Sequence, residues 1–170
     1  MIIWLTGGQG SGKSLVMKFL KEKGFSCIYA DKIVHELYKS GNDGETLIVK
    51  NFGERFLNKQ GNVCRMKLKK LALENVKNIE RLNKLMHPLV YKKIIELIDK
   101  YLASGKENIV IEAVYFDEKK FGKIVNKVIW VERENRKKEF SIKNPSRVDD
   151  VLKNNGSIAD LKKSVYYLVR

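Results

Sequence analysis

The sequence predicts an α/β fold in which helices cover both faces of a parallel sheet of about five strands. Short apolar segments recur along the chain, as expected for strands that are buried on both faces of such a sheet. Amphipathic helical segments separate them, and the length of 170 residues suits a single domain with one main core. We therefore expect one three-layer domain, with a core formed by residues 1–31 and 106–170 and a helical insertion at residues 32–105.

The first strand, helix and second strand follow one another directly at the start of the chain. Residues 2–5 form an apolar run, residues 13–23 have apolar positions at helical spacing with Gly24 as the stop, and residues 26–29 form a second short strand. Asp31 comes where this second strand ends and the next helix begins. Ligands of open α/β folds gather at the carboxyl ends of the strands, so we expect Asp31 at the ligand-binding edge.

The predicted insertion is rich in helix-forming residues. Turn signals interrupt its helical pattern near Gly53, at residues 58–61 and near Pro88, where we expect one helix to end and another to start.

The last part of the chain returns to strands. We expect strands at residues 108–113 and 127–131, followed by a charged, exposed segment at residues 132–147 and a last short strand that ends at Asn154. Ser157 and Asp160 have the spacing of a capping box, which predicts that a final helix begins there.

The composition indicates a soluble chain with an affinity for anions. Lys and Arg number 34 against 20 Asp and Glu, which gives a net charge of +14 and favours nucleic acid or phosphorylated metabolites as partners. The basic residues alternate with acidic ones and form no aromatic-plus-basic module, so we expect no specific nucleic acid.

Other features of the composition argue against a membrane protein and a disulfide framework. No apolar run approaches the roughly 18 residues of a membrane span, and no signal peptide precedes the first strand, so we expect a cytoplasmic location. Cys27 and Cys64 are too few for a disulfide framework or a zinc site, and we expect both thiols to be reduced.

Residues 7–14 read Gly-Gly-Gln-Gly-Ser-Gly-Lys-Ser and match the phosphate-binding pattern G-x-x-x-x-G-K-[ST], which makes the expected fold a P-loop NTPase. Glycines let backbone N–H groups converge on phosphate oxygens, the lysine bridges the outer phosphates and the last serine holds Mg²⁺. The strand before the motif and the helix after it are the context that the motif requires. We therefore expect a nucleoside triphosphate and Mg²⁺ to bind here, with Ser14 as the metal ligand. The expected phosphate-binding residues are Gly8, Gln9, Gly10, Ser11, Gly12, Lys13, Ser14 and Leu15.

Phosphate binding alone does not separate a kinase from a GTPase or a motor. The nearest match to a guanine-reading Asn-Lys-x-Asp motif is at residues 83–86 and lacks the aspartate, and a motor ATPase generally needs a longer chain. A small-molecule kinase fits the size, and Asp31 can serve as its base. The alternative is that Asp31 only caps the helix that follows it.

Several segments together resemble the dephospho-CoA kinase family, in the same order and at roughly the same spacing over nearly the whole chain. They are Leu-Thr-Gly-Gly-x-Gly-Ser-Gly-Lys-Ser at residues 5–14, Ala-Asp at 30–31, Phe-Gly at 52–53, Met-His-Pro-Leu at 86–89, Ile-Val-Ile-Glu-Ala at 109–113 and Asn-Asn-Gly-Ser at 154–157.

This resemblance implies transfer of the ATP γ-phosphoryl group to the ribose 3′-hydroxyl of dephospho-CoA, the last step of coenzyme A synthesis. It implies that Asp31 accepts or orients the hydroxyl proton and that His87 belongs to the substrate-binding helical region. The alternative for His87 is a packing role at a helix start before Pro88. The resemblance also places Asn154, Asn155 and Gly156 beside the adenine of ATP.

The sequence departs from the family at three places. Tyr29 stands where the family often has the first aspartate of Asp-x-Asp, residues 113–115 read Ala-Val-Tyr where the family commonly has Pro-Leu-Leu, and the lid at residues 132–147 is shorter than usual. Lid arginines neutralise charge on the transferring phosphoryl group. Of Arg133, Arg136 and Arg147, we expect Arg136, which Lys137 and Lys138 follow, to be the catalytic lid arginine. The alternatives are another small-molecule or nucleotide kinase, or a non-catalytic ATP-binding relative with a degenerate lid. The sequence sets no oligomeric state.

Overall fold

The structure is a computed structural model that describes residues 1–134 and 145–170, and the chain divides into two compact units. The first unit consists of residues 1–29 and 97–170, and the second consists of residues 30–96. The phosphate-binding loop belongs to the first unit.

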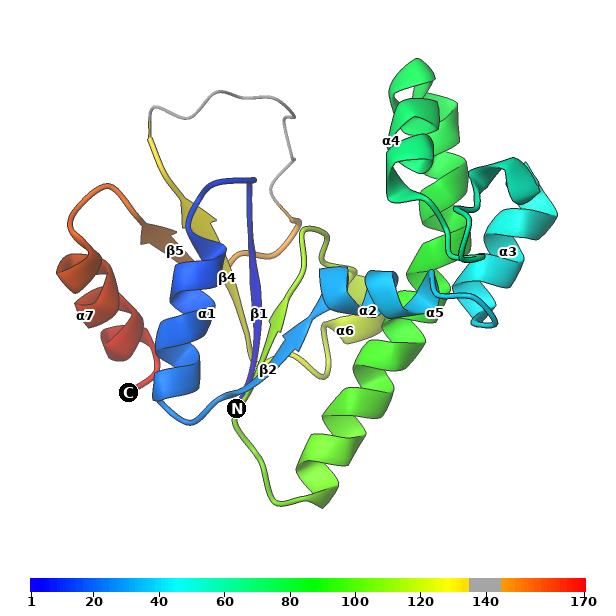
Figure 1. The fold of residues 1–170 in the computed structure, drawn as a ribbon. Coiled ribbons are helices and arrows are strands. Elements are labelled where there is room, and N and C mark those ends of the chain that lie inside the picture. Colours follow the sequence, from blue (N-terminus) through cyan, green and yellow to red (C-terminus); the bar gives the residue numbers. More distant parts are fainter. Residues whose placement is uncertain (135–144) are drawn as a thin grey trace. The chain divides into compact units, whose positions relative to one another are not determined.

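The first unit is built on a five-stranded sheet with the order β2-β3-β1-β4-β5, in which every neighbouring pair is parallel (Figure 1). The strands are β1 (Ile2–Gly7), β2 (Ser26–Tyr29), β3 (Ile109–Glu112), β4 (Lys127–Glu132) and β5 (Asp150–Lys153). The central strand β1 lies between β3 and β4, so the strand order reverses beside it. Ligands of open α/β sheets bind outside the carboxyl ends of the strands at such a point.

Both faces of β1 are covered, which explains why this strand is apolar without alternation. All six of its residues are buried. Ile3 and Leu5 belong to a core cluster with residues of α1 (Lys13–Glu22) and α7 (Ile158–Leu168), and these two helices lie side by side on one face of the sheet (Figure 1). On the opposite face, Trp4 packs against Phe121 of the short helix α6 (Glu118–Phe121), with ring centroids 4.8 Å apart. The predicted three-layer α/β class is therefore confirmed.

The start of α7 has the capping box that the sequence predicts. The Ser157 hydroxyl accepts a hydrogen bond from the Asp160 amide at 3.2 Å, and the Asp160 carboxylate accepts one from the Ser157 amide at 3.1 Å. Two N–H groups that would have no partner inside the helix are thereby satisfied. Hydrogen bonds from the Ser157 hydroxyl and amide lower the pKa of Asp160, which keeps the carboxylate charged at the positive end of the helix.

The second unit is helical. Its elements are α2 (Ala30–Leu37), α3 (Asp43–Phe52), the 3₁₀ turn η1 (Glu54–Phe56), α4 (Arg65–Glu74) and most of α5 (Val76–Ala103). Ile48 of α3 and Ile94 of α5 are fully buried. A Cβ on Gly44 would lie 2.6 Å from the Leu37 carbonyl oxygen, so the close approach of α2 and α3 requires a glycine there.

The helix break predicted near Pro88 is wrong. Pro88 lies inside α5, which runs unbroken from Val76 to Ala103. Proline removes one N–H donor from the helix and costs about 3 kcal/mol in a helix interior. The buried apolar positions Met86, Val90 and Ile94 continue at helical spacing across it, and their burial offsets that cost.

Within residues 1–134 and 145–170, no helix combines the length and the hydropathy that crossing a bilayer requires.

Candidate active site

The phosphate-binding loop joins β1 to α1, and its glycines adopt conformations that other residues rarely reach. Gly10 and Gly12 have φ angles of 74° and 101°, and Gly12 is the N-cap of α1 without a side-chain cap. The amide of Leu15 donates to the carbonyl of Gly12 at 3.0 Å. The amides of Gly12, Lys13 and Ser14 come earlier in the chain, where a helix supplies no acceptor for its N–H groups. The loop therefore presents backbone donors at the positive end of α1.

The positive charge of Lys13 lies over the beginning of this loop. Its ammonium donates to the carbonyl oxygens of Gly7 and Gly8 at 2.9 and 3.0 Å. The first turn of α1 contains no acidic residue, so the charge of Lys13 adds to that of the helix terminus. Ser14, in the same turn, is exposed. This donor set fits the phosphates of ATP, and the Ser14 hydroxyl is suitably placed in the chain to hold Mg²⁺.

Ser11 gives an independent sign that the loop accommodates an anion. Its side chain is 1% exposed, and its hydroxyl has no hydrogen-bond partner among the residues that the structure describes. A buried hydroxyl without a partner costs about 1–3 kcal/mol. A phosphate oxygen is an acceptor that would satisfy it.

Thr6 and Gly7, which are not among the predicted phosphate-binding residues, fix the loop to the sheet. The Thr6 hydroxyl, fully buried, donates to the Val114 carbonyl at 2.7 Å and so joins the end of β1 to the segment after β3. Gly7 has a φ of 144°, and a Cβ on it would overlap the carbonyl oxygen of Val131 on β4. In the sequence, only the run Leu-Thr-Gly-Gly at residues 5–8 points to these two residues. Their partners Val114 and Val131 lie more than 100 positions further along the chain, so the sequence does not predict the contacts themselves.

Asn154 and Asn155 reach from the end of β5 to two other segments of the first unit. The side-chain amide of Asn154 donates to the Ser11 carbonyl at 2.9 Å, across 143 positions of sequence. The side-chain oxygen of Asn155 accepts a hydrogen bond from the Glu134 amide at 2.8 Å, just beyond β4. The structure thus brings the predicted Asn-Asn pair to the phosphate-binding loop and to the exit of β4.

Asp31 does not occupy the capping position. The helix α2 begins at Ala30, so Asp31 lies in its first turn, where a carboxylate still interacts favourably with the helix terminus. The alternative that Asp31 is the N-cap of this helix is therefore wrong, because Asp31 lies inside the helix. Its side chain is exposed and belongs to the second compact unit.

Tyr29, the residue at the departure from the family pattern, ends β2 opposite Glu112 of β3. Burial raises the pKa of Tyr29, and the neighbouring Cys27 and Glu112 raise it further. Its phenol therefore stays neutral and cannot replace the charge of a carboxylate at this position.

His87 lies in the interior of α5, and its alternative role at a helix start is therefore wrong. The hydroxyl of Tyr91, one turn further along, is 3.4 Å from Nδ1 of His87, and the two ring centroids are 5.5 Å apart. The ring of His87 is half-buried beside this tyrosine.

Arg136, the arginine chosen for the lid, lies outside the described residues. Arg147 is engaged structurally: its guanidinium donates to the carbonyls of Gly122, Val125 and Asn126 at 3.3, 3.2 and 2.8 Å and pairs with Asp149 at 2.9 Å. These contacts tie the residue to the turn before β4.

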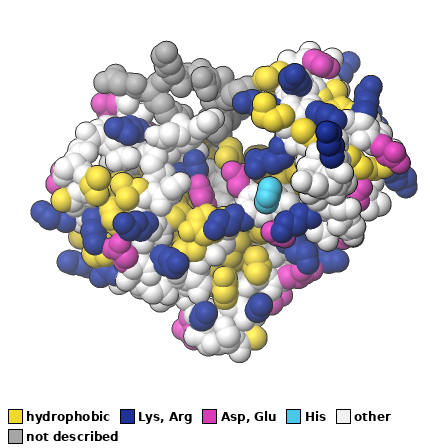
Figure 2. All heavy atoms as spheres, viewed as in Figure 1, with side chains coloured by type: hydrophobic (Ala, Val, Ile, Leu, Met, Phe, Trp, Pro, Cys, Tyr) yellow, Lys and Arg dark blue, Asp and Glu magenta, His cyan; other side chains and the backbone are white. Residues whose placement is uncertain are grey.

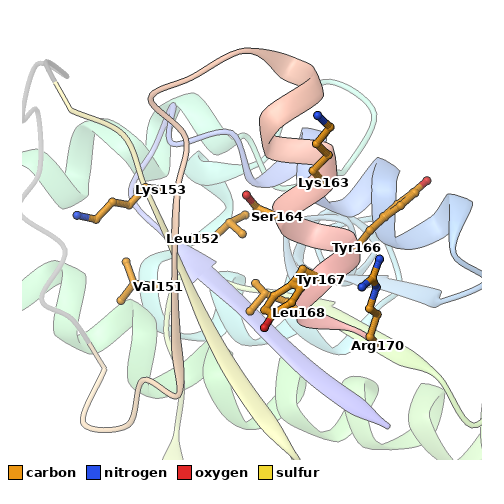
Figure 3. A pocket seen from close by; sticks show the side chains of 9 residues that line it. All are labelled: Val151, Leu152, Lys153, Lys163, Ser164, Tyr166, Tyr167, Leu168 and Arg170. Carbon is orange, nitrogen blue, oxygen red and sulfur yellow. The ribbon is translucent and has the colours of Figure 1, made fainter.

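A groove of about 740 Å³ lies between β5 and α7, and the residues that line it include none of the phosphate-binding loop (Figure 3). Lys153 and Lys163 border it, but Figure 3 shows their side chains pointing in different directions rather than toward a common centre. A ligand site needs a few polar groups that converge. We therefore place the active site at the phosphate-binding loop.

The basic side chains are spread over the face of the molecule that Figure 2 shows. Figure 2 shows Lys and Arg scattered across the visible face among acidic and apolar side chains. This distribution differs from the basic stripe that marks a surface for nucleic acid.

Comparisons with known proteins identify the family to which the chain belongs. A model of the family described as dephospho-CoA kinase matches residues 1–138. A dephospho-CoA kinase of Fusobacterium nucleatum is 34% identical, with 97% of this chain and 95% of that protein covered. A dephospho-CoA kinase of Carboxydothermus hydrogenoformans is 33% identical, with 89% of this chain and 74% of that protein covered.

Solved structures show the same fold. A dephospho-CoA kinase from Campylobacter jejuni superposes with a TM-score of 0.68 at 19% identity, covering 99% of this chain and 95% of its own. A shikimate kinase from Aquifex aeolicus gives a TM-score of 0.54 at 16% identity, covering 99% and 96%. The family match and the two sequence relatives each span most of the chain. These matches confirm the prediction from the sequence that the protein is an ATP-dependent kinase of coenzyme A biosynthesis. We conclude that the chain belongs to the dephospho-CoA kinase family.

Proposed function

We propose that this chain transfers the γ-phosphoryl group of ATP to the ribose 3′-hydroxyl of dephospho-CoA. The observation that carries the proposal is the placement of Lys13 in a complete phosphate-binding loop at the head of α1, in a chain with dephospho-CoA kinases as relatives over nearly its whole length. Little covalent chemistry is required of a phosphoryl-transfer enzyme, and positioning with electrostatic stabilisation supplies most of the rate.

The loop residues bind and neutralise the phosphates in this proposal. The backbone amides of Gly12, Lys13 and Ser14 donate to phosphate oxygens, and the Lys13 ammonium moves from the loop carbonyls to the outer phosphates. Mg²⁺ supplies a Lewis acid for the phosphate oxygens when it is bound, and the Ser14 hydroxyl would hold it. In this proposal the buried Ser11 hydroxyl, which has no partner among the described residues, donates to a phosphate oxygen.

The acceptor side of the proposal relies on the helical segment. We propose that the predicted insertion at residues 32–105 covers the acceptor and that His87 contributes to its binding. Asp31 accepts or orients the proton of the attacking hydroxyl. Its position in the chain supports this role, because it follows the carboxyl end of β2 by two residues.

We propose that the backbone of residues 154–156 lies beside the adenine of ATP and that Arg136 of the lid at residues 132–147 neutralises charge on the transferring group. Tyr29 lacks the charge of the acid that it replaces, so Asp31 carries the base function without a second carboxylate at that position. We also propose that the chain works in the cytoplasm, where ATP and precursors of coenzyme A are available.

The test of this function is the identity of the product. The chain is incubated with ATP, Mg²⁺ and dephospho-CoA, and the phosphorylated position of the product is assigned by ³¹P and proton NMR. We expect a new phosphomonoester on the ribose 3′-oxygen, and no comparable product from AMP or shikimate as acceptor. Faster phosphorylation of AMP or shikimate than of dephospho-CoA would contradict the proposal.

A further inference from the structure

The contact between Asn154 and the phosphate-binding loop has a direct consequence for a phosphate donor. The Nδ2 atom of Asn154 donates to the carbonyl oxygen of Ser11 at 2.9 Å. That carbonyl and the N–H of Gly12 belong to the same peptide group. The peptide is trans, so its carbonyl and its N–H point in opposite directions. By holding the Ser11 carbonyl, Asn154 turns the Gly12 N–H away from itself.

The geometry around Gly12 shows that this approach is close. Gly12 has a φ of 101°, and a Cβ on it would overlap Nδ2 of Asn154. Glycine is therefore needed at this position both for the backbone conformation and for the side chain that lies against it.

The backbone of Asn154 is fixed to the sheet. Its own amide donates to the Glu132 carbonyl at 2.8 Å, which extends the pairing of β4 with β5 by one residue. Leu152, two positions earlier, is 2% exposed in the core cluster that also contains Val16 of α1. Because the Asn154 side chain is short and its backbone is fixed, its amide holds the Ser11 carbonyl oxygen in a defined position.

The Ser11 side chain makes no contribution to holding the loop. Its buried hydroxyl has no partner among the described residues, while its amide donates to the Gly8 carbonyl at 3.2 Å within the loop itself. The contact from Asn154 is therefore one that connects this part of the loop to the far end of the sheet.

We propose that Asn154 is a positioning residue for phosphate binding, which sets the orientation of the Ser11–Gly12 peptide and thereby of the Gly12 N–H. The proposal rests on the use of this loop for the phosphates of ATP, and it assigns the Asn154 side chain to the phosphates rather than to the adenine. Loss of the Asn154 side chain should therefore lower the binding affinity of every ligand that carries the phosphate chain, whatever base is attached to that chain.

The test compares ATP with inorganic tripolyphosphate, which has the phosphate chain without the nucleoside. Dissociation constants of both are measured by competition against a fluorescent ATP analogue, for the wild type, Asn154→Ala and Asn154→Leu. Leucine has nearly the shape of asparagine but no donor, so this variant keeps the packing. Val151→Ala, an exposed position on β5, is the matched control. Thermal unfolding of each protein is recorded to verify the fold.

We expect both Asn154 variants to bind ATP and tripolyphosphate more weakly by the same factor, roughly 3- to 10-fold, which is the effect of one hydrogen bond. Val151→Ala should bind both like the wild type. Weaker ATP binding with unchanged tripolyphosphate binding would assign Asn154 to the adenine and overturn the proposal, as would unchanged binding of both.

The outcome of this binding test does not depend on whether dephospho-CoA is the acceptor. If the wild type binds tripolyphosphate and the Asn154 variants lose affinity, the proposal stands even when dephospho-CoA is not phosphorylated. A wild type that does not bind tripolyphosphate would overturn the premise that this loop holds phosphates, and the role of Asn154 with it.

Discussion

Gly12 and Asn154 are packed so closely that a single methyl group on Gly12 would overlap the side-chain amide of Asn154. The two residues come from opposite ends of the chain, one in the loop after β1 and the other just after β5. Their contact joins the phosphate-binding loop to the edge of the sheet.

The first prediction concerns Gly12→Ala. Any residue other than glycine is strained at the φ of 101°, and here the methyl group also collides with Asn154. We expect the variant to lose most of its ATP affinity, measured by calorimetry. The control is Gly24→Ala, with a similar φ of 87° but no atom within 4 Å of the added Cβ. It should lose about 1–2 kcal/mol of stability and keep its ATP affinity. If Gly12→Ala and Gly24→Ala bound ATP with equal affinity, the collision of the added methyl group with Asn154 would have no effect on ATP binding, which contradicts the prediction.

The second prediction concerns Asp31→Asn. If Asp31 accepts or orients the hydroxyl proton, turnover should fall by roughly 100- to 10,000-fold while ATP affinity barely changes. The loss of one first-turn charge should cost about 0.3–1 kcal/mol of stability. Asp43→Asn is the matched control, because Asp43 is an exposed acidic residue in the first turn of α3. It should show the same small change in stability and normal turnover in steady-state assays. A stable Asp31→Asn with normal turnover would leave Asp31 a structural residue only.

Local patterns predicted much of the fold. The phosphate-binding loop, the capping box at Ser157 and the second strand at residues 26–29 were all predicted, because each depends on residues within a few positions of one another. The continuation of α5 through Pro88 was missed because burial of distant apolar residues outweighed the local preference.

Contacts between distant segments account for the parts of the site that the sequence did not predict. Thr6 reaches Val114 and Asn154 reaches Ser11 across more than 100 positions, and neither distance nor direction can be read from the residue types. Arg147 was one of three arginines available for the lid, and only the fold shows its guanidinium bound to three backbone carbonyls.

The third prediction concerns the pH dependence of the Arg147–Asp149 pair. Burial opposes ionisation of Asp149, but hydrogen bonds from the Val128 amide and the Arg147 side chain outweigh it, so the pKa of Asp149 is lowered. A lowered pKa contributes stability that is complete above the unfolded-state pKa of about 3.9 and is lost as the pH falls through the folded-state value.

Urea unfolding of Asp149→Asn at several pH values checks this. At pH 6 the variant should be less stable than the wild type by up to about 1 kcal/mol, because the pair is partly exposed. The difference should shrink as the pH falls below about 4. Asp99→Asn, an exposed position on α5, is the control and should show no comparable difference at pH 6. A constant difference across this range would contradict the role of the charge.

The fourth prediction is that the net charge of +14 serves anionic metabolites rather than duplex DNA. A protein that neutralises several DNA phosphates shows a log–log salt slope of about −0.9 for each one. We expect weak DNA retention at low salt that disappears at physiological salt, whereas ATP and dephospho-CoA still bind there. Titrations of labelled duplex, labelled ATP and dephospho-CoA at two salt concentrations measure this. Submicromolar DNA binding at physiological salt without dephospho-CoA binding would favour a nucleic-acid function.

The most direct measurement of the central claim is a coupled assay of ADP release with dephospho-CoA as the acceptor, for the wild type, Lys13→Ala and Lys18→Ala. Both lysines lie on α1, but Lys18 is exposed and away from the loop, while the Lys13 ammonium lies over it. The account predicts acceptor-dependent ADP release by the wild type and Lys18→Ala, and loss of that activity in a folded Lys13→Ala. Near wild-type turnover by Lys13→Ala, or ADP release that does not depend on dephospho-CoA, would contradict it.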